Sequence, residues 1–310
     1  MAKYRHQLPQ LSEKIFVTDG GMETTLIFHQ GVQLPAFAAF DLLTREGGRE
    51  MLADYYRRYL ALAQQYRAGF ILESVTWRAN ADWGATIGYD RKQLARINRD
   101  AIAMLQDLRE QYETEQSPMV ISGCIGPRGD GYKPGAMMTA EQARDYHGEQ
   151  VATLRDTAAD MISAITMTTI EEGLGIALAA QDAQMPVVIS FTLETDGRLP
   201  SGQSLRDAIE TVDAQTREKP AYYMINCAHP EHFSDVLQGA WLARIRGLRA
   251  NASRRSHAEL DEATELDAGN PHELGQQYRE LRKVLTGLNV LGGCCGTDHR
   301  HVAAICASCC

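Results

Sequence analysis

The strongest constraint on the fold is an alternation, repeated eight times, of short apolar runs with longer amphipathic segments. This pattern is typical of parallel strands covered by helices, and eight such units favour a closed barrel over an open sheet. We therefore expect one α/β domain over residues 1–310, a (β/α)8 TIM barrel. The expected strands are Ile15–Thr18, Phe70–Val75, Met119–Cys124, Met161–Thr166, Pro186–Thr192, Tyr222–Cys227, Ile245–Ala250 and Asn289–Gly293.

The segments between these strands show helical periodicity. Glu50–Gln65 carries apolar residues at helical spacing, and a second series of apolar positions runs from Leu94 to Tyr112. Thr139 and Gln142 fit the two halves of a capping box, in which each side chain satisfies a free backbone N–H group. We expect a third helix to begin there.

Charge and hydropathy exclude several classes of protein. The formal net charge is −9 and no run of Lys or Arg occurs, so nucleic acids and anionic membranes are poor partners. No window approaches the roughly 18 apolar residues of a membrane span, and the N-terminus does not resemble a secretory signal. We expect a cytoplasmic protein that acts on small molecules, and the sequence leaves homo-oligomerisation open.

Polar residues gather where the expected strands end. In TIM barrels these C-terminal strand ends face the active site, so residues there are candidates for substrate binding. They are Asp19, Gly20, Gly21, Glu73, Thr76, Thr166, Asn226 and Asn251. Two long polar loops, Gly126–Met138 and Ala252–Pro271, fit either lids over the site or exposed decoration.

The seven cysteines point to a metal site. In a reducing compartment, cysteines are more often metal ligands or free thiols than disulfides. Cys294 and Cys295 are adjacent between glycines, whose backbone freedom lets both sulfurs aim at one point. Cys227 ends a strand near theirs in the closed ring, so three thiolates and one open position would form a catalytic zinc site. The alternative is that these cysteines are buried structural residues.

Four segments of the chain resemble signature segments of the homocysteine S-methyltransferase family. The segments are Asp19-Gly20-Gly21-Met22-Glu23-Thr24, Ser122-Gly123-Cys124-Ile125-Gly126-Pro127, Asn226-Cys227-Ala228-His229-Pro230 and Gly292-Gly293-Cys294-Cys295-Gly296-Thr297. The similarity runs from about Phe16 to about Thr297, nearly the whole chain. The segments around Cys227 and around Cys294 and Cys295 carry most of its specificity.

The resemblance implies a role for each matching residue. Cys227, Cys294 and Cys295 would bind Zn2+, and Asp19 with the backbone of Gly20 and Gly21 would hold the acceptor. Zinc keeps a bound thiol deprotonated and therefore nucleophilic at neutral pH. The expected reaction moves a methyl group from a small onium donor, such as S-methylmethionine, to homocysteine and gives methionine.

One position departs from the family pattern. The family usually has a glutamate at the end of the fourth strand that binds the ammonium group of the acceptor, and this chain has Ile165 there. A buried ammonium group without a carboxylate is costly. Either Glu73 or Glu194 takes the role, or the acceptor is another thiol or a selenol.

The donor and the C-terminus give weaker signals. Aromatic faces hold methylated onium groups, and aromatic residues near strand ends are Trp77, Trp83, Tyr89 and Phe191. The C-terminal cysteines Cys306, Cys309 and Cys310 suggest a short exposed tail over residues 306–310, and we expect truncation after Ala304 to leave activity nearly intact. A noncatalytic zinc- or thiol-binding barrel is the alternative function that this cysteine-rich end suggests.

Overall fold

The computed structural model describes residues 1–310, and its central feature is a closed barrel of eight parallel strands. The barrel closes where Phe16 of the first strand pairs with Val290 of the last. The fold expected from the sequence is confirmed, and every strand lies within two residues of its expected bounds. The strands are β1 (Phe16–Val17), β2 (Gly69–Glu73), β3 (Met119–Ile125), β4 (Met161–Met167), β5 (Val187–Thr192), β6 (Tyr222–Asn226), β7 (Ile245–Ala250) and β8 (Val290–Gly293).

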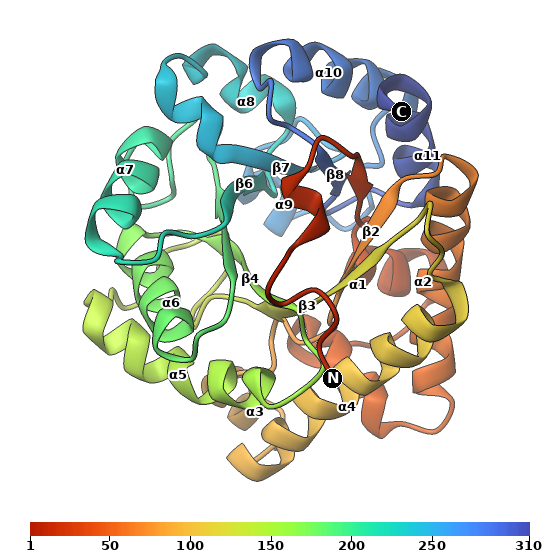
Figure 1. Ribbon diagram of the computed structural model, residues 1–310, viewed down its shortest axis with the longest axis vertical. Helices are drawn as coiled ribbons and strands as arrows, with labels where there is room; N and C mark the ends of the chain where they lie inside the picture. Colours follow the sequence, from red (N-terminus) through yellow and green to blue (C-terminus); the bar gives the residue numbers. More distant parts are fainter.

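Helices surround the barrel (Figure 1). They are α1 (Met22–Thr24), α2 (Gly48–Gln65), α3 (Ala81–Thr86), α4 (Arg91–Tyr112), α5 (Ala140–Arg155), α6 (Ile170–Asp182), α7 (Leu205–Gln215), α8 (Pro230–Phe233), α9 (His257–Asp261), α10 (Pro271–Val284) and α11 (His299–Cys309). The expected capping box is present at the start of α5, where Thr139 and Gln142 exchange hydrogen bonds with each other's backbone. No helix has both the length and the apolar character needed to cross a membrane.

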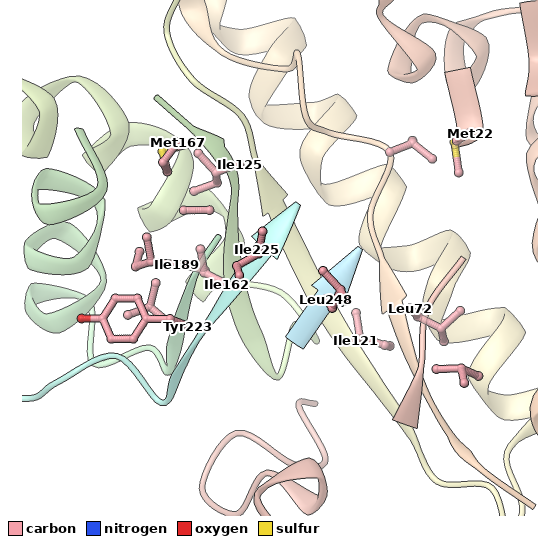
Figure 2. Packing of buried hydrophobic residues seen from close by; sticks show 14 of the residues in the cluster. Met22, Leu72, Ile121, Ile125, Ile162, Met167, Ile189, Tyr223, Ile225 and Leu248 are labelled. Carbon is pink, nitrogen blue, oxygen red and sulfur yellow. The ribbon is translucent and has the colours of Figure 1, made fainter. Parts of the chain in front are cut away.

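The two faces of most strands pack into different clusters, as β2 illustrates. Phe70 and Leu72 of β2 belong to the larger cluster of 71 buried residues, which fills the space between strands and helices. Ile71, between them, belongs to a smaller cluster of nine residues inside the barrel. This alternation follows from the two-residue period of strands. Figure 2 shows part of the larger cluster, including Leu72 and Ile121.

The N-terminal segment closes one end of the barrel, as the red trace in Figure 1 shows. Leu8 packs into the interior cluster. The Asn289 side-chain amide donates hydrogen bonds to the backbone carbonyls of Gln10, Ser12 and Lys14, just before β8. This end of the barrel is therefore filled, and the opposite end, at the C-termini of the strands, is left for a site.

The C-terminal residues belong to the fold. Cys306 and Cys309 lie in α11, which packs against α10. The side chain of Cys306 is fully buried in the larger core cluster, whereas Cys310 is exposed. The expectation of an exposed tail was therefore wrong for Cys306, because the apolar face of α11 covers the barrel and carries this residue with it.

Candidate active site

A cavity of about 420 Å³ opens at the C-terminal ends of the strands. Its lining includes Asp19, Glu73, Thr166 and the three cysteines singled out in the sequence. The barrel interior is apolar near its N-terminal end and becomes polar toward this cavity. Glu73 follows Ile71 on the same face of β2, two residues later. The cavity thus has a polar floor above an apolar plug.

The three cysteines converge in this cavity. Cys227 directly follows β6, and Cys294 and Cys295 directly follow β8. Their three Sγ atoms lie within 4.8 Å of one another, and those of Cys227 and Cys295 are 4.0 Å apart. Cys227 and Cys294 are paired as a disulfide in this structure. The ends of β6 and β8 thus bring Cys227 next to a cysteine pair that begins 67 positions later in the chain.

Close packing explains the glycines beside these cysteines. A Cβ atom on Gly292 would lie 1.9 Å from Oγ1 of Thr18, and one on Gly293 would lie 2.0 Å from Oγ1 of Thr297. Gly296 has φ +78°, a turn that glycine adopts without strain. Cys227 has φ +52°, which is unusual for a residue with a side chain and is typical of functional sites.

The chemistry of the cluster fits a thiophilic metal ion. Tetrahedral zinc with Zn–S bonds of about 2.3 Å separates its sulfur ligands by roughly 3.8 Å, close to the distance between the Cys227 and Cys295 sulfurs. Burial raises the pKa of the Cys295 thiol, so a cation is needed to hold it as a thiolate. The Tyr132 hydroxyl donates to Cys295 Sγ at 3.3 Å, and a thiolate is the better acceptor for this bond.

A buried ion pair lies beside the cluster. Asp19 accepts a hydrogen bond from Nη2 of Arg249 at 2.7 Å and another from the Tyr55 hydroxyl at 3.0 Å. The Arg249 guanidinium also donates to the carbonyl of Gly293, just before the cysteine pair. The charge of Asp19 is therefore neutralised by Arg249. This ion pair fixes the loop after β1 against β7 and β8.

Two other carboxyl groups that line the cavity, neither of them fully exposed, have no ion-pair partner. Glu73 is buried and its Oε2 atom has no hydrogen-bond partner. Burial raises its pKa. Glu23, at the start of α1, is half-buried, and burial raises its pKa to about 7, with the nearby charge of Asp19 adding to the effect. Both groups are suited to accept a cation from a substrate.

The end of β4 is apolar where the family has a carboxylate. Ile165 lines the cavity and is 6% exposed, and its carbonyl accepts a hydrogen bond from the Trp77 indole. Thr166, with φ +68°, also lines the cavity. The Asn226 side chain holds it by accepting from the Thr166 N–H and donating to its hydroxyl.

Several predicted residues lie behind the cavity wall. Asn226, Thr76, Asn251 and Glu194 are not among its lining residues. The Thr76 hydroxyl donates to the Cys124 carbonyl, and the Asn251 amide donates to the Cys227 carbonyl. The carboxylate of Glu194 pairs with His257, whose other ring nitrogen contacts the Cys227 carbonyl at 2.6 Å. These contacts support the backbone that carries the site.

Both long polar loops contribute to the cavity. Tyr132, in the first loop, stacks on His257, in the second, with ring centroids 4.2 Å apart. Lys133 and Asp261 also join the two loops, at 2.9 Å. Of the two readings of the loops, the structure supports the lid, because they meet over the sulfur cluster.

Sequence reasoning missed Arg249, Arg78, Tyr132 and Glu23, although all four line the cavity. Arg249 carried a usable signal, since a charged residue within an expected apolar strand needs a buried partner. Trp77 and Trp83 line the cavity as expected for aromatic residues at a site. Tyr89 instead donates a hydrogen bond to Asp41, and Phe191 is fully buried against Tyr223.

Comparison with known proteins identifies relatives over almost the whole chain. A family model described as homocysteine S-methyltransferase matches residues 16–309. A selenocysteine Se-methyltransferase of Brassica oleracea var. italica is 24% identical over 93% of this chain and 87% of its own. A homocysteine S-methyltransferase of Escherichia coli (strain K12) is 24% identical over 83% of this chain and 82% of its own.

Solved structures share the fold. The oxidized form of the homocysteine methyltransferase MmuM from Escherichia coli superposes with a TM-score of 0.78 at 20% identity, covering 98% of this chain and 99% of that one. Its metallated form superposes with a TM-score of 0.73 at 21% identity, covering 97% and 98%. The barrel and the order of its elements are therefore those of this enzyme.

Proposed function

Because the chain belongs to the homocysteine S-methyltransferase family and is a methyltransferase, we propose that it transfers a methyl group to the zinc-bound thiolate of homocysteine, giving methionine. The donor is a small onium compound such as S-methylmethionine. The observation that carries this proposal is the convergence of Cys227, Cys294 and Cys295 at the floor of the cavity, with their sulfurs within 4.8 Å.

The three cysteines would hold the metal and leave one position open for the acceptor. Zinc at this site would keep the coordinated acceptor thiol deprotonated at neutral pH. Tyr132 orients Cys295 through its hydrogen bond to the sulfur. The two loops that meet through Tyr132 and His257 exclude water from the acceptor.

Glu23 and Glu73 are the groups that would receive the ammonium of the acceptor. Both line the cavity and neither has a salt-bridge partner, whereas Asp19 is neutralised by Arg249 and Glu194 lies outside. Of the two carboxylates considered from the sequence, the geometry therefore supports Glu73. Glu23 is an addition from the structure.

A selenol or a different thiol is the second candidate for the acceptor. Ile165 at the end of β4 motivates it, because an acceptor without an ammonium group at this place in the cavity needs no carboxylate there. A relative named as a selenocysteine Se-methyltransferase matches 93% of this chain. The chemistry is shared, since a selenol also binds zinc as its anion and attacks the same donor carbon.

The test follows one methyl group through the reaction. Reduced, zinc-loaded protein is mixed with unlabelled homocysteine and S-methylmethionine that has a 13C backbone and deuterated methyl groups. Methionine with a deuterated methyl group and no 13C can arise only by transfer to the acceptor. We expect this product from the wild type and from Cys310→Ser, whose thiol is exposed.

Cys295→Ala should lose both bound zinc and product, because it removes one of three thiolates. Methyl transfer by zinc-free protein would contradict the proposal. One tightly bound zinc per chain, with no transfer to homocysteine, selenocysteine or other thiols, would instead favour a noncatalytic zinc-binding barrel.

A further inference from the structure

Arg78 lies in the cavity wall and takes no part in the function described above. It follows β2, its side chain is 7% exposed, and burial lowers its pKa to about 10, so it stays cationic at neutral pH. Trp77 and Trp83 flank the guanidinium, with Cζ 4.2 Å and 3.7 Å from the ring centroids. The two indoles fix the plane of this cation through cation–π contact.

The guanidinium is only partly satisfied by the protein. Nη1 donates to the Gly129 carbonyl at 3.0 Å, which also accepts from the Trp83 indole. Nη2 is 3.8 Å from a carboxylate oxygen of Asp130, which is 45% exposed, and Nε is buried without any hydrogen-bond partner. Nε and Nη2 form the edge that binds a carboxylate through two parallel hydrogen bonds.

Arg249, the other buried cation of the cavity, differs in this respect. Its Nη2 is 2.7 Å from Asp19 and its Nε donates to the Gly293 carbonyl. The Nε and Nη2 groups of Arg249 therefore already have hydrogen-bond partners within the protein. Arg78 instead keeps one edge of its guanidinium unpaired. The carboxylate within salt-bridge distance, that of Asp130, lies in the Gly126–Met138 loop, and the charge of Glu23 also acts on Arg78.

Arg78 lies close to Ile165, the residue at the end of β4 that departs from the family pattern. The Trp77 indole that stacks on Arg78 also donates to the carbonyl of Ile165. The part of the cavity where the family has an ammonium-binding glutamate is therefore covered here by an isoleucine and a tryptophan, with a cation next to them. This arrangement disfavours an ammonium group and favours an anionic one.

We propose that Arg78 binds the carboxylate of a small amino-acid-like substrate, so that the substrate lies with its carboxylate toward β2 and β4. The proposal rests on the proposed methyl transfer, and it adds the residue that selects carboxylate-bearing substrates. The carboxylate belongs to the acceptor or to the onium donor, and each is tested separately. With the carboxylate at Arg78, an ammonium on the same substrate is directed toward Glu23 or Glu73.

The experiment compares ligands that differ by one charged group. Reduced, zinc-loaded protein is titrated calorimetrically with homocysteine, 4-mercaptobutyrate, which lacks the amine, and 3-aminopropanethiol, which lacks the carboxylate. Separate titrations use S-methylmethionine and its decarboxylated analogue. The variants are Arg78→Gln, Arg78→Lys and, as a matched control, the exposed Arg206→Gln.

Arg78→Gln should weaken the carboxylate-bearing acceptors or the carboxylate-bearing donor about 10- to 100-fold and leave the decarboxylated partner unchanged. The affected set identifies whose carboxylate is bound. Arg78→Lys should recover part of the loss, and Arg206→Gln should match the wild type. Equal weakening of all ligands, or of none, would overturn the assignment.

Failure of the methyltransferase proposal has a different signature. If the wild type binds none of the thiols at the zinc centre and methylates none of them, both proposals fail. If the wild type binds and methylates homocysteine but Arg78→Gln shows no carboxylate dependence, only the role of Arg78 fails. Circular dichroism and thermal melting of each variant show whether it is folded.

Discussion

Gly292 and Gly293 show how single residues determine this site. They precede Cys294 because any side chain would collide with the hydroxyls of Thr18 and Thr297. The sequence pattern correctly marked this segment, although the physical cause is close packing more than backbone freedom. Arg78 and Tyr132 could not be foreseen, because their roles depend on contacts between segments far apart in the chain.

Glu23 gives a pH-dependent signature at the same scale. Its pKa in the folded protein is about 7, against about 4.5 in an unfolded chain, mainly because of burial. The folded state therefore holds the extra proton between these values, and stability falls as pH rises from about 4.5 to about 7. The charged form is the one penalised.

Replacing Glu23 by Gln should remove this penalty in the reduced, zinc-free protein. We expect Glu23→Gln to melt at a higher temperature than the wild type at pH 8 and at nearly the same temperature at pH 4.5. Thermal melting across this range measures both. Glu115→Gln, at an exposed site, serves as a control. Parallel profiles for wild type and Glu23→Gln would show that the burial of this carboxyl is not penalised.

At the scale of elements, the strands were predictable and the loops were not. The strands follow from local apolar runs, and β7 was predicted residue for residue. The loops that cover the site pair by contacts such as Tyr132 with His257, which join segments 125 positions apart and leave no local periodicity. The C-terminal cysteines were expected to lie in an exposed tail, whereas α11 buries Cys306 in the core.

Truncation after Ala304 should therefore be harmful, contrary to the expectation from the sequence. It removes Ile305 and Cys306, both fully buried, and the bond from Arg282 to the Cys309 carbonyl. Loss of a buried aliphatic side chain costs about 2–5 kcal/mol, which corresponds to a fall in melting temperature of roughly 3–8 °C in a chain of this length. Thermal melting of the truncated chain measures this.

Removal of Cys310 alone is the control for that truncation. This residue is exposed, so its loss should change the melting temperature by little. A chain ending at Ala304 that melts with the full-length protein would mean that α11 contributes nothing beyond its first turns.

For the whole molecule, the barrel separates stability from function. The N-terminal end is sealed by Leu8 and by hydrogen bonds from the Asn289 side-chain amide to backbone carbonyls, and the apolar plug lies above it. The C-terminal end holds the charges, the cysteines and the lids. The apolar pattern was sufficient to predict the barrel. It was not sufficient to predict that Asp19 pairs with Arg249 while Glu23 and Arg78 line the same cavity, because these positions depend on how the barrel closes.

In the proposed function, three cysteines bind zinc and leave its fourth position to the acceptor thiol. Zinc X-ray absorption spectroscopy on the reduced, zinc-loaded protein, without and with homocysteine, tests it most directly. We predict three sulfur ligands at about 2.3 Å alone and four with homocysteine. A sulfur count that stays the same on adding homocysteine, or fewer than three sulfurs at the start, would contradict this mode of zinc and acceptor binding.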